Sequence, residues 1–221
     1  MVLSRLILNP RSRQVRSELA DLYELHRTVM KAFAGQSQAG GRVLFRVDLH
    51  PHTGVPTLLV QSGSAPNWDF LNAPEKDYLL GADDLPLGVE NPGVKPFEVV
   101  LQSGQVLTFR LRANPTRKID REGQAQGRRV GLLREEEQMD WLKRKIEAAG
   151  GALLSARVAN ESLTTGKLYR GAEKHSLQLT SVQFDGTLQV QDPERLRLAL
   201  EAGIGSGKGF GFGLLSLARA A

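Results

Sequence analysis

The sequence predicts an α+β protein built from two tandem units that each follow the order βαββαβ. Three observations carry this prediction. Short alternating apolar segments occur in both halves, helix-period segments separate them, and 221 residues suffice for one large domain or two of about 100 residues each. The hydrophobic fraction of 41% and charged fraction of 24% exclude a disordered or collagen-like chain. The order βαββαβ is that of a ferredoxin-like fold.

The first unit is expected at residues 1–115. Leu22, Leu25, Val29 and Phe33 recur at helical spacing, and a turn signal at 50–54 separates two β-rich segments, which predicts a hairpin. The expected elements are a strand at 2–8, a helix within 18–34, strands at 42–49 and 56–62, a mostly irregular proline-rich stretch at 64–97 with room for one degraded helix, and a strand at 105–112.

The second unit is expected at residues 132–221. Asp192 and Pro193 suit the N-cap and first position of a short helix. The other expected elements are a helix at 134–149, strands at 152–158, 163–170, 174–184 and 187–191, and a last strand at 213–218. This unit either opens on its helix or takes one strand from elsewhere in the chain.

The positive charge is concentrated in one segment. Residues 110–129 hold seven basic and two acidic side chains, a local net of +5, which equals the net charge of the whole chain. We expect a mobile basic linker or loop at 116–131, and phosphate contacts from Arg110, Arg112, Arg117, Lys118, Arg128 and Arg129. A predicted hairpin at 157–175 adds Arg157, Lys167, Arg170 and Lys174, which either contact nucleic acid or are solvated charges that protect a sheet edge.

Other residue types narrow the function classes. The chain has no cysteine, which excludes disulfides, thiolate zinc sites and cysteine nucleophiles. The sequence 1–11 lacks the features of a signal peptide and no apolar run reaches membrane-spanning length, so we expect a cytoplasmic protein. Asp48, His50 and His52 alternate as a metal site can, but Pro51 favours a loop, and no metal or other cofactor is expected.

A glycine-rich stretch occupies residues 203–213. It does not fit a Walker A loop or a dinucleotide-binding fingerprint. If extended, it directs Ile204, Ser206, Lys208, Phe210 and Phe212 to one face and leaves the other bare. It is either a tight-packing loop or a backbone cradle for phosphates, with Lys208 as counter-charge and its glycines Gly203, Gly205, Gly207, Gly209, Gly211 and Gly213.

Tyr23 and His26 are the candidate catalytic pair. They are three residues apart, so on a helix they share a face, and Arg27 and Lys31 add positive charge nearby. Histidine exchanges protons near neutral pH and a phenol can donate to an oxyanion. Taken alone, His26 is better explained as an ordinary surface histidine or one with its hydrogen bonds satisfied.

Together these pieces resemble the CasE family of endoribonucleases, which process CRISPR repeat RNA in type I-E systems. The matching segments are Leu3–Asn9, Tyr23–Arg27, Phe109–Pro115, Val190–Pro193 with the helix after it, and Gly203–Gly213 with Leu214-Leu215-Ser216. The resemblance implies a cut on the 3′ side of a repeat hairpin without metal, and catalysis by the Tyr and His that align with Tyr23 and His26. It further implies that the enzyme stays bound to the crRNA hairpin beside other Cascade subunits.

One alternative from another class remains open. A non-catalytic RNA-binding or scaffold protein of a CRISPR ribonucleoprotein can have the same fold. An RRM-type module needs aromatic residues in an RNP pattern on its central strands, and Phe45 and Phe109 are too sparse for that. The intact Tyr23–His26 pair favours the enzyme.

Overall fold

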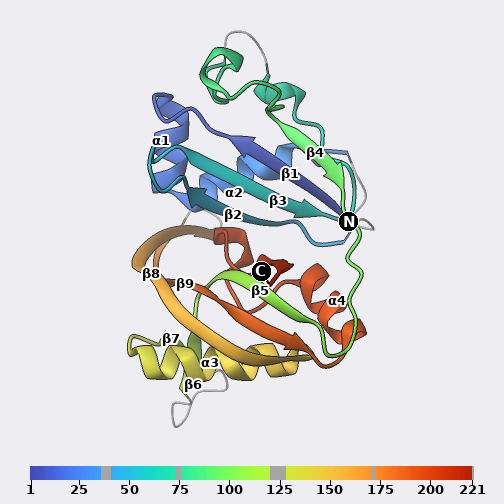
Figure 1. Cartoon of the computed structure of the whole chain (residues 1–221). Coiled ribbons are helices and arrows are strands. Elements are labelled where there is room, and N and C mark those ends of the chain that lie inside the picture. The colour runs from blue at the N-terminus through green and yellow to red at the C-terminus, as the bar shows by residue number, and fades with distance from the viewer. Residues whose placement is uncertain (36–40, 73–75, 120–127, 171–172, 221) are drawn as a thin grey trace. The chain divides into compact units, whose positions relative to one another are not determined.

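Two compact units make up the chain (Figure 1). The computed structural model describes residues 1–35, 41–72, 76–119, 128–170 and 173–220, with backbone alone at 128, 163–170 and 173–178. The first unit comprises Met1–Val99, Gly166–His175 and Gly209–Gly211, and the second comprises Val100–Thr165, Ser176–Lys208 and Phe212–Ala221. Among the described helices, none is long and apolar enough to cross a membrane.

The first unit is built on a four-stranded antiparallel sheet in the order β2-β3-β1-β4, the ferredoxin-like order. Its elements are β1 (Val2–Ile7), α1 (Arg13–Ala20), α2 (Leu22–Lys31), β2 (Leu44–Leu49), β3 (Pro56–Ser62), the short 3-10 helices η2 (Asp69–Leu71) and η3 (Ala82–Asp84), and β4 (Gly93–Pro96). The predicted β2–β3 hairpin is confirmed, and Phe45 pairs with Val60 in its register.

Helix capping and apolar periodicity explain why α1 and α2 form where they do. The Ser12 side chain accepts a hydrogen bond from the Val15 backbone N–H at 3.4 Å, which caps α1. Leu25 and Val29, one turn apart on α2, are fully buried. The apolar spacing therefore predicted a helix correctly, although the start of α1 lies before the expected range.

The second unit has the same strand order, β10-β5-β9-β8. Its elements are β5 (Val106–Ala113), β6 (Thr116–Ile119), β7 (Arg128–Gly131), α3 (Glu135–Ala148), β8 (Gly151–Arg170), β9 (Glu173–Val190), α4 (Pro193–Ala202), the 3-10 helix η4 (Lys208–Phe210, shared with the first unit) and β10 (Leu215–Arg219). Alternate residues of β5 and β9 form its core with Trp141 and Ile146 of α3. These features confirm the α+β class with two tandem ferredoxin-like units.

Three expectations about individual segments were wrong. The strand at 105–112 does not complete the first sheet: β5 pairs with β9 and β10 in the second sheet, where it is the strand that the second unit takes from elsewhere. The first sheet is closed instead by β4, from the proline-rich stretch predicted to be irregular. Both described ends of the expected linker at 116–131 are strands, because β6 and β7 pair with each other.

Candidate active site

Helix α2 carries the predicted catalytic pair. The Asp21 side chain accepts a hydrogen bond from the Tyr23 backbone N–H at 3.3 Å and so caps the helix. Because Leu22 and Leu25 turn into the core, Tyr23 and His26 lie half-buried at its edge. Their ring centroids are 6.4 Å apart, which confirms that the two side chains lie together. Their catalytic roles remain a prediction.

A buried carboxylate joins α2 to its neighbours. Glu18 of α1 is 7% exposed, and its Oε1 accepts hydrogen bonds from the Thr28 hydroxyl at 2.9 Å and from Gln14 Nε2 at 2.8 Å. Its Oε2 accepts from the Tyr78 hydroxyl at 2.6 Å. Burial, and then the bond to Glu18, raise the pKa of Tyr78 far above its usual range, so the phenol remains a donor. Three donors satisfy this buried charge and fix α2 against α1.

His26 contacts an aromatic ring and a backbone segment of the same unit. Its imidazole stacks on Phe45 of β2 with ring centroids 6.0 Å apart and planes at 14°. Gly209 also lies beside the ring, and an added Cβ there would lie 3.6 Å from His26 Cδ2. Desolvation by burial lowers the pKa of His26 below its usual 6.5, so the ring is mainly neutral at pH 7 in the free protein.

The glycine-rich segment is not extended, so its alternate side chains do not share the single face that an extended chain would give them. Its glycines Gly203, Gly205, Gly207, Gly211 and Gly213 have φ between +74° and +93°. This left-handed conformation turns the chain instead of extending it, and glycine adopts it without strain. Phe210 is 8% exposed and its ring centroid lies 6.2 Å from that of Tyr23. In the first unit the segment 209–211 thus forms a wall beside both candidate residues.

Three predicted phosphate contacts, on α2 and in the glycine-rich segment, differ in their surroundings. Arg27 is exposed and pairs with Glu24 of its own helix at 3.0 Å, a surface pair that a phosphate can displace at little cost. Lys31 is exposed on the last turn of α2. Lys208 donates a hydrogen bond to the Gly205 carbonyl at 2.8 Å, so it helps to hold the glycine-rich turn.

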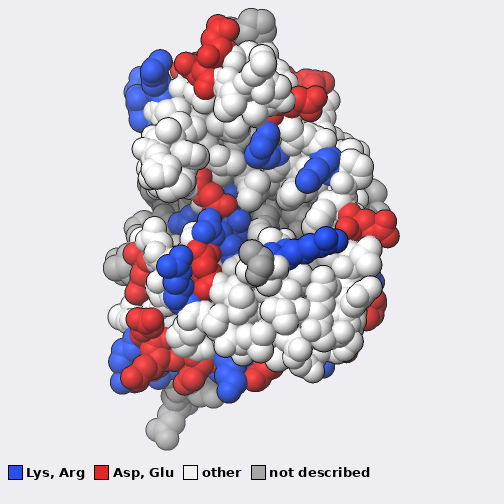
Figure 2. Space-filling view, in the orientation of Figure 1, with Lys and Arg blue, Asp and Glu red and all other residues white. Residues whose placement is uncertain are grey.

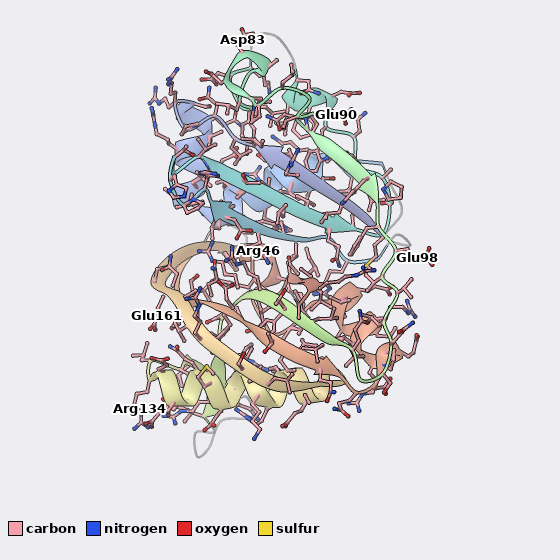
Figure 3. The ribbon with its side chains drawn as sticks, in the orientation of Figure 1. Arg46, Asp83, Glu90, Glu98, Arg134 and Glu161 are labelled. Carbon is pink, nitrogen blue, oxygen red and sulfur yellow. The ribbon has the colours of Figure 1, made fainter. Side chains whose placement is uncertain are left out.

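The β6–β7 hairpin carries part of the basic stretch. Arg117 pairs with Glu137 of α3 at 3.2 Å, and Arg129 donates a long hydrogen bond of 3.5 Å to the Thr116 hydroxyl. Glu137 also accepts from Arg134, labelled in Figure 3. Figure 2 shows acidic side chains among the basic ones over α3 and this hairpin. Lys118 is exposed, and the side chain of Arg128 lies outside the described set.

Other predicted basic residues gather on the open face of the second sheet. A shallow groove of about 660 Å³ is lined by residues that include Arg110 and Arg157. Arg110 pairs through two hydrogen bonds, of 2.7 and 2.8 Å, with Asp185, which sequence reasoning had not singled out. These bonds are the main reason that the pKa of Asp185 lies below its usual range. Arg112 donates to the Ser181 hydroxyl at 2.8 Å.

The remaining predicted residues, Lys167, Arg170 and Lys174, lie on β8 and β9, and their side chains are outside the described set. Sequence reasoning also missed Phe45 as a partner of His26. No local signal marks such a contact, because it joins residues of α2 and β2 that only the fold brings together.

Comparison with known proteins covers nearly the whole chain. A family model described as "CRISPR associated protein" matches residues 1–219. CRISPR-associated endoribonuclease Cse3 of Thermus thermophilus is 37% identical over 229 residues, which cover 99% of this chain and 100% of that protein. CRISPR system Cascade subunit CasE of Escherichia coli is 30% identical over 208 residues, or 89% of this chain and 88% of the relative.

The fold agrees with these sequence matches. A structure of Cse3 bound to a 19-nucleotide RNA superposes with a TM-score of 0.82 and 36% identity, covering 99% of this chain and 100% of that one. These matches confirm the resemblance predicted from the sequence. The chain belongs to the family of CRISPR-associated proteins that includes Cse3 and CasE.

Proposed function

We propose that this protein is an endoribonuclease that cleaves CRISPR repeat RNA on the 3′ side of a stem-loop without a metal ion. It then remains bound to the crRNA hairpin as a Cascade subunit, in the cytoplasm. The observation that carries the proposal is the lateral pairing of Tyr23 and His26 on α2, beside the segment 209–211. The names of the relatives support it: one is an endoribonuclease matched over 100% of its length, and the other is a Cascade subunit matched over 88% of its length.

The chemistry needs only proton transfer and alignment. The 2′-hydroxyl of the nucleotide before the cut attacks the adjacent phosphorus and loses its proton. The bond from phosphorus to the 5′-oxygen breaks, and that oxygen gains a proton. The products are a 2′,3′-cyclic phosphate and a 5′-hydroxyl, so atoms and charges balance without an external reactant.

His26 and Tyr23 divide the proton transfers in this scheme. Since burial keeps His26 neutral in the free protein, its imidazole suits removal of the 2′-proton. An approaching phosphate raises its pKa, and the ring then suits protonation of the leaving 5′-oxygen. Tyr23 takes the complementary role or donates to the phosphorane oxygens, and Arg27 and Lys31 offset the added negative charge.

RNA binding depends on basic residues that follow the phosphate backbone of an A-form stem. We assign this role to the β6–β7 hairpin and the β8–β9 hairpin. The glycine-rich segment contributes backbone N–H groups near the cut.

The test is cleavage of the host's own repeat hairpin in EDTA, followed by analysis of the new ends. We expect one defined cut that leaves a 2′,3′-cyclic phosphate. His26→Ala should slow it by at least about 100-fold, the usual contribution of a proton-transfer group, while hairpin affinity changes little. A full requirement for metal, or a 3′-hydroxyl product, would refute the mechanism.

A second substrate separates the two roles of His26. An RNA with sulfur in place of the leaving 5′-oxygen needs no proton on its leaving group. If His26 protonates that oxygen, the sulfur substrate restores cleavage by His26→Ala. If the variant stays equally slow, His26 is the base at the 2′-hydroxyl.

A further inference from the structure

We propose that Phe45 is a positioning residue that holds the His26 imidazole so that Nε2, and not Nδ1, exchanges the proton with RNA. Gly209 completes this arrangement by leaving the Nε2 edge of the ring uncovered. The inference rests on the proposed function for the identity of the reaction. The arrangement of the ring can be tested without any RNA.

The ring of Phe45 that stacks on His26 is buried and closely packed. Phe45 is 0% exposed, and its centroid distance of 6.0 Å and angle of 14° to His26 suit an offset stack. Behind it, an added Cβ at Gly211 would lie 3.1 Å from Phe45 Cε2. Since Gly211 has φ +76°, glycine suits this position both in space and in backbone conformation. The backbone at Gly211 therefore packs closely against the Phe45 ring.

The two nitrogens of His26 lie in different surroundings. Nδ1 is buried and has no hydrogen-bond partner among the described residues. Gly209 lies against the part of the ring that includes Nε2, where an added Cβ would lie 3.6 Å from Cδ2, 3.7 Å from Nε2 and 3.9 Å from Cγ. A Cβ at these distances makes ordinary contact, and a longer side chain would add further atoms beside the ring. Glycine at this position thus leaves Nε2 open to substrate.

Burial of Nδ1 decides which nitrogen can reach RNA. Because Nδ1 is enclosed and has no described partner to which it could pass a proton, only Nε2 can exchange a proton with a substrate. Nε2 accepts a proton when the neutral ring carries its hydrogen on Nδ1, and it donates one when the ring is protonated on both nitrogens. Desolvation by burial disfavours the charged ring and lowers the pKa of His26.

Charged neighbours do not account for the lowered pKa of His26. On α2, Glu24 and Arg27 pair with each other at 3.0 Å. On β2, Arg46 follows Phe45, projects to the opposite face of the strand, and pairs with Asp48 at 2.9 Å. The segment 209–211 holds no titratable side chain. Tyr23 is the titratable group whose ring lies beside His26.

The first experiment measures the imidazole directly, by NMR of protein labelled with ¹⁵N-histidine and titrated without RNA. In the wild type we expect solvent-linked titration through Nε2 and a pKa below 6.5. Phe45→Leu should raise that pKa and allow the ring more than one orientation. The control is Phe33→Leu, the same substitution in the same unit at a ring that contacts Trp68 instead. Titration through Nδ1, or an unchanged pKa in Phe45→Leu, would overturn the inference.

The second experiment adds a side chain at Gly209, beside Nε2, and leaves the buried Phe45 unchanged. Gly209 does not have a positive φ, so larger residues cause no backbone strain there. We expect kcat for hairpin cleavage to fall progressively from glycine to alanine to leucine at position 209, by at least tenfold for Gly209→Leu. KM of the variants at position 209 should change by less than threefold. In a separate measurement on Phe45→Leu, the part of the pH–rate profile that reports the titration of His26 should move to higher pH. Equal kcat for glycine and leucine at 209 would refute the role of Nε2.

The two proposals can fail separately. If the wild type does not cleave repeat RNA, the proposed function is wrong, and the NMR titration still tests the ring arrangement. If the wild type cleaves and the titration runs through Nδ1, only the positioning inference is wrong.

Discussion

Replacing Tyr78 with phenylalanine tests the buried connection that supports α2. The change removes only the hydroxyl that donates to Glu18 Oε2 at 2.6 Å. Tyr78 is 1% exposed and Glu18 is 7% exposed, so water has little access to replace the lost donor. A hydrogen bond to a charged group contributes roughly 1.5–3 kcal/mol, and a buried charged oxygen without a donor is costly. We expect Tyr78→Phe to lower the free energy of unfolding by about 2 kcal/mol, or roughly a 30-fold shift toward the unfolded state.

Urea denaturation of wild type and variant side by side, followed by circular dichroism, measures this difference. Thr28→Val is the matched comparison, because Gln14 still donates to Oε1 after the Thr28 hydroxyl is lost. It should destabilise the protein less than Tyr78→Phe does. A loss below about 0.5 kcal/mol for Tyr78→Phe would show that Glu18 is not the buried, charged acceptor that we describe.

Three further predictions concern the second unit. Asp185 has a lowered pKa in the folded state, so its pairing with Arg110 should contribute stability that is present above about pH 4 and lost as the pH falls further. Denaturation of Asp185→Asn from pH 7 to pH 2 should accordingly show its deficit against wild type shrinking, and a constant deficit would contradict this. Gly150→Ala should lower the melting temperature more than Gly104→Ala. Both glycines have positive φ, but only at Gly150 would a Cβ lie 2.7 Å from a backbone carbonyl oxygen. Neutralising Arg117, Lys118 and Arg129 together should make hairpin binding less sensitive to salt. The slope of log K against log salt concentration should become shallower by up to about 0.9 for each phosphate contact that is lost. An unchanged slope in a binding titration would remove the β6–β7 hairpin from the RNA interface.

The sequence predicted the local parts of the structure well. The spacing of Leu25 and Val29 predicted the helix that carries Tyr23 and His26, and alternation predicted β5 itself. It did not predict which sheet β5 joins, because that depends on pairs such as Arg110 with Asp185, which are distant in the chain. For the same reason, the sequence did not indicate that Phe45 contacts His26. Sheet partners follow from the register of the whole fold, and periodicity reports only which face of an element is buried.

The position of Gly209–Gly211 in the first unit has a consequence for biosynthesis. His26 and Phe45 are translated well before Gly209–Gly211, the wall beside them. A ribosome-bound chain that has not reached this segment carries the imidazole but lacks the backbone that borders it. We therefore expect nuclease activity only in chains synthesised through residue 211.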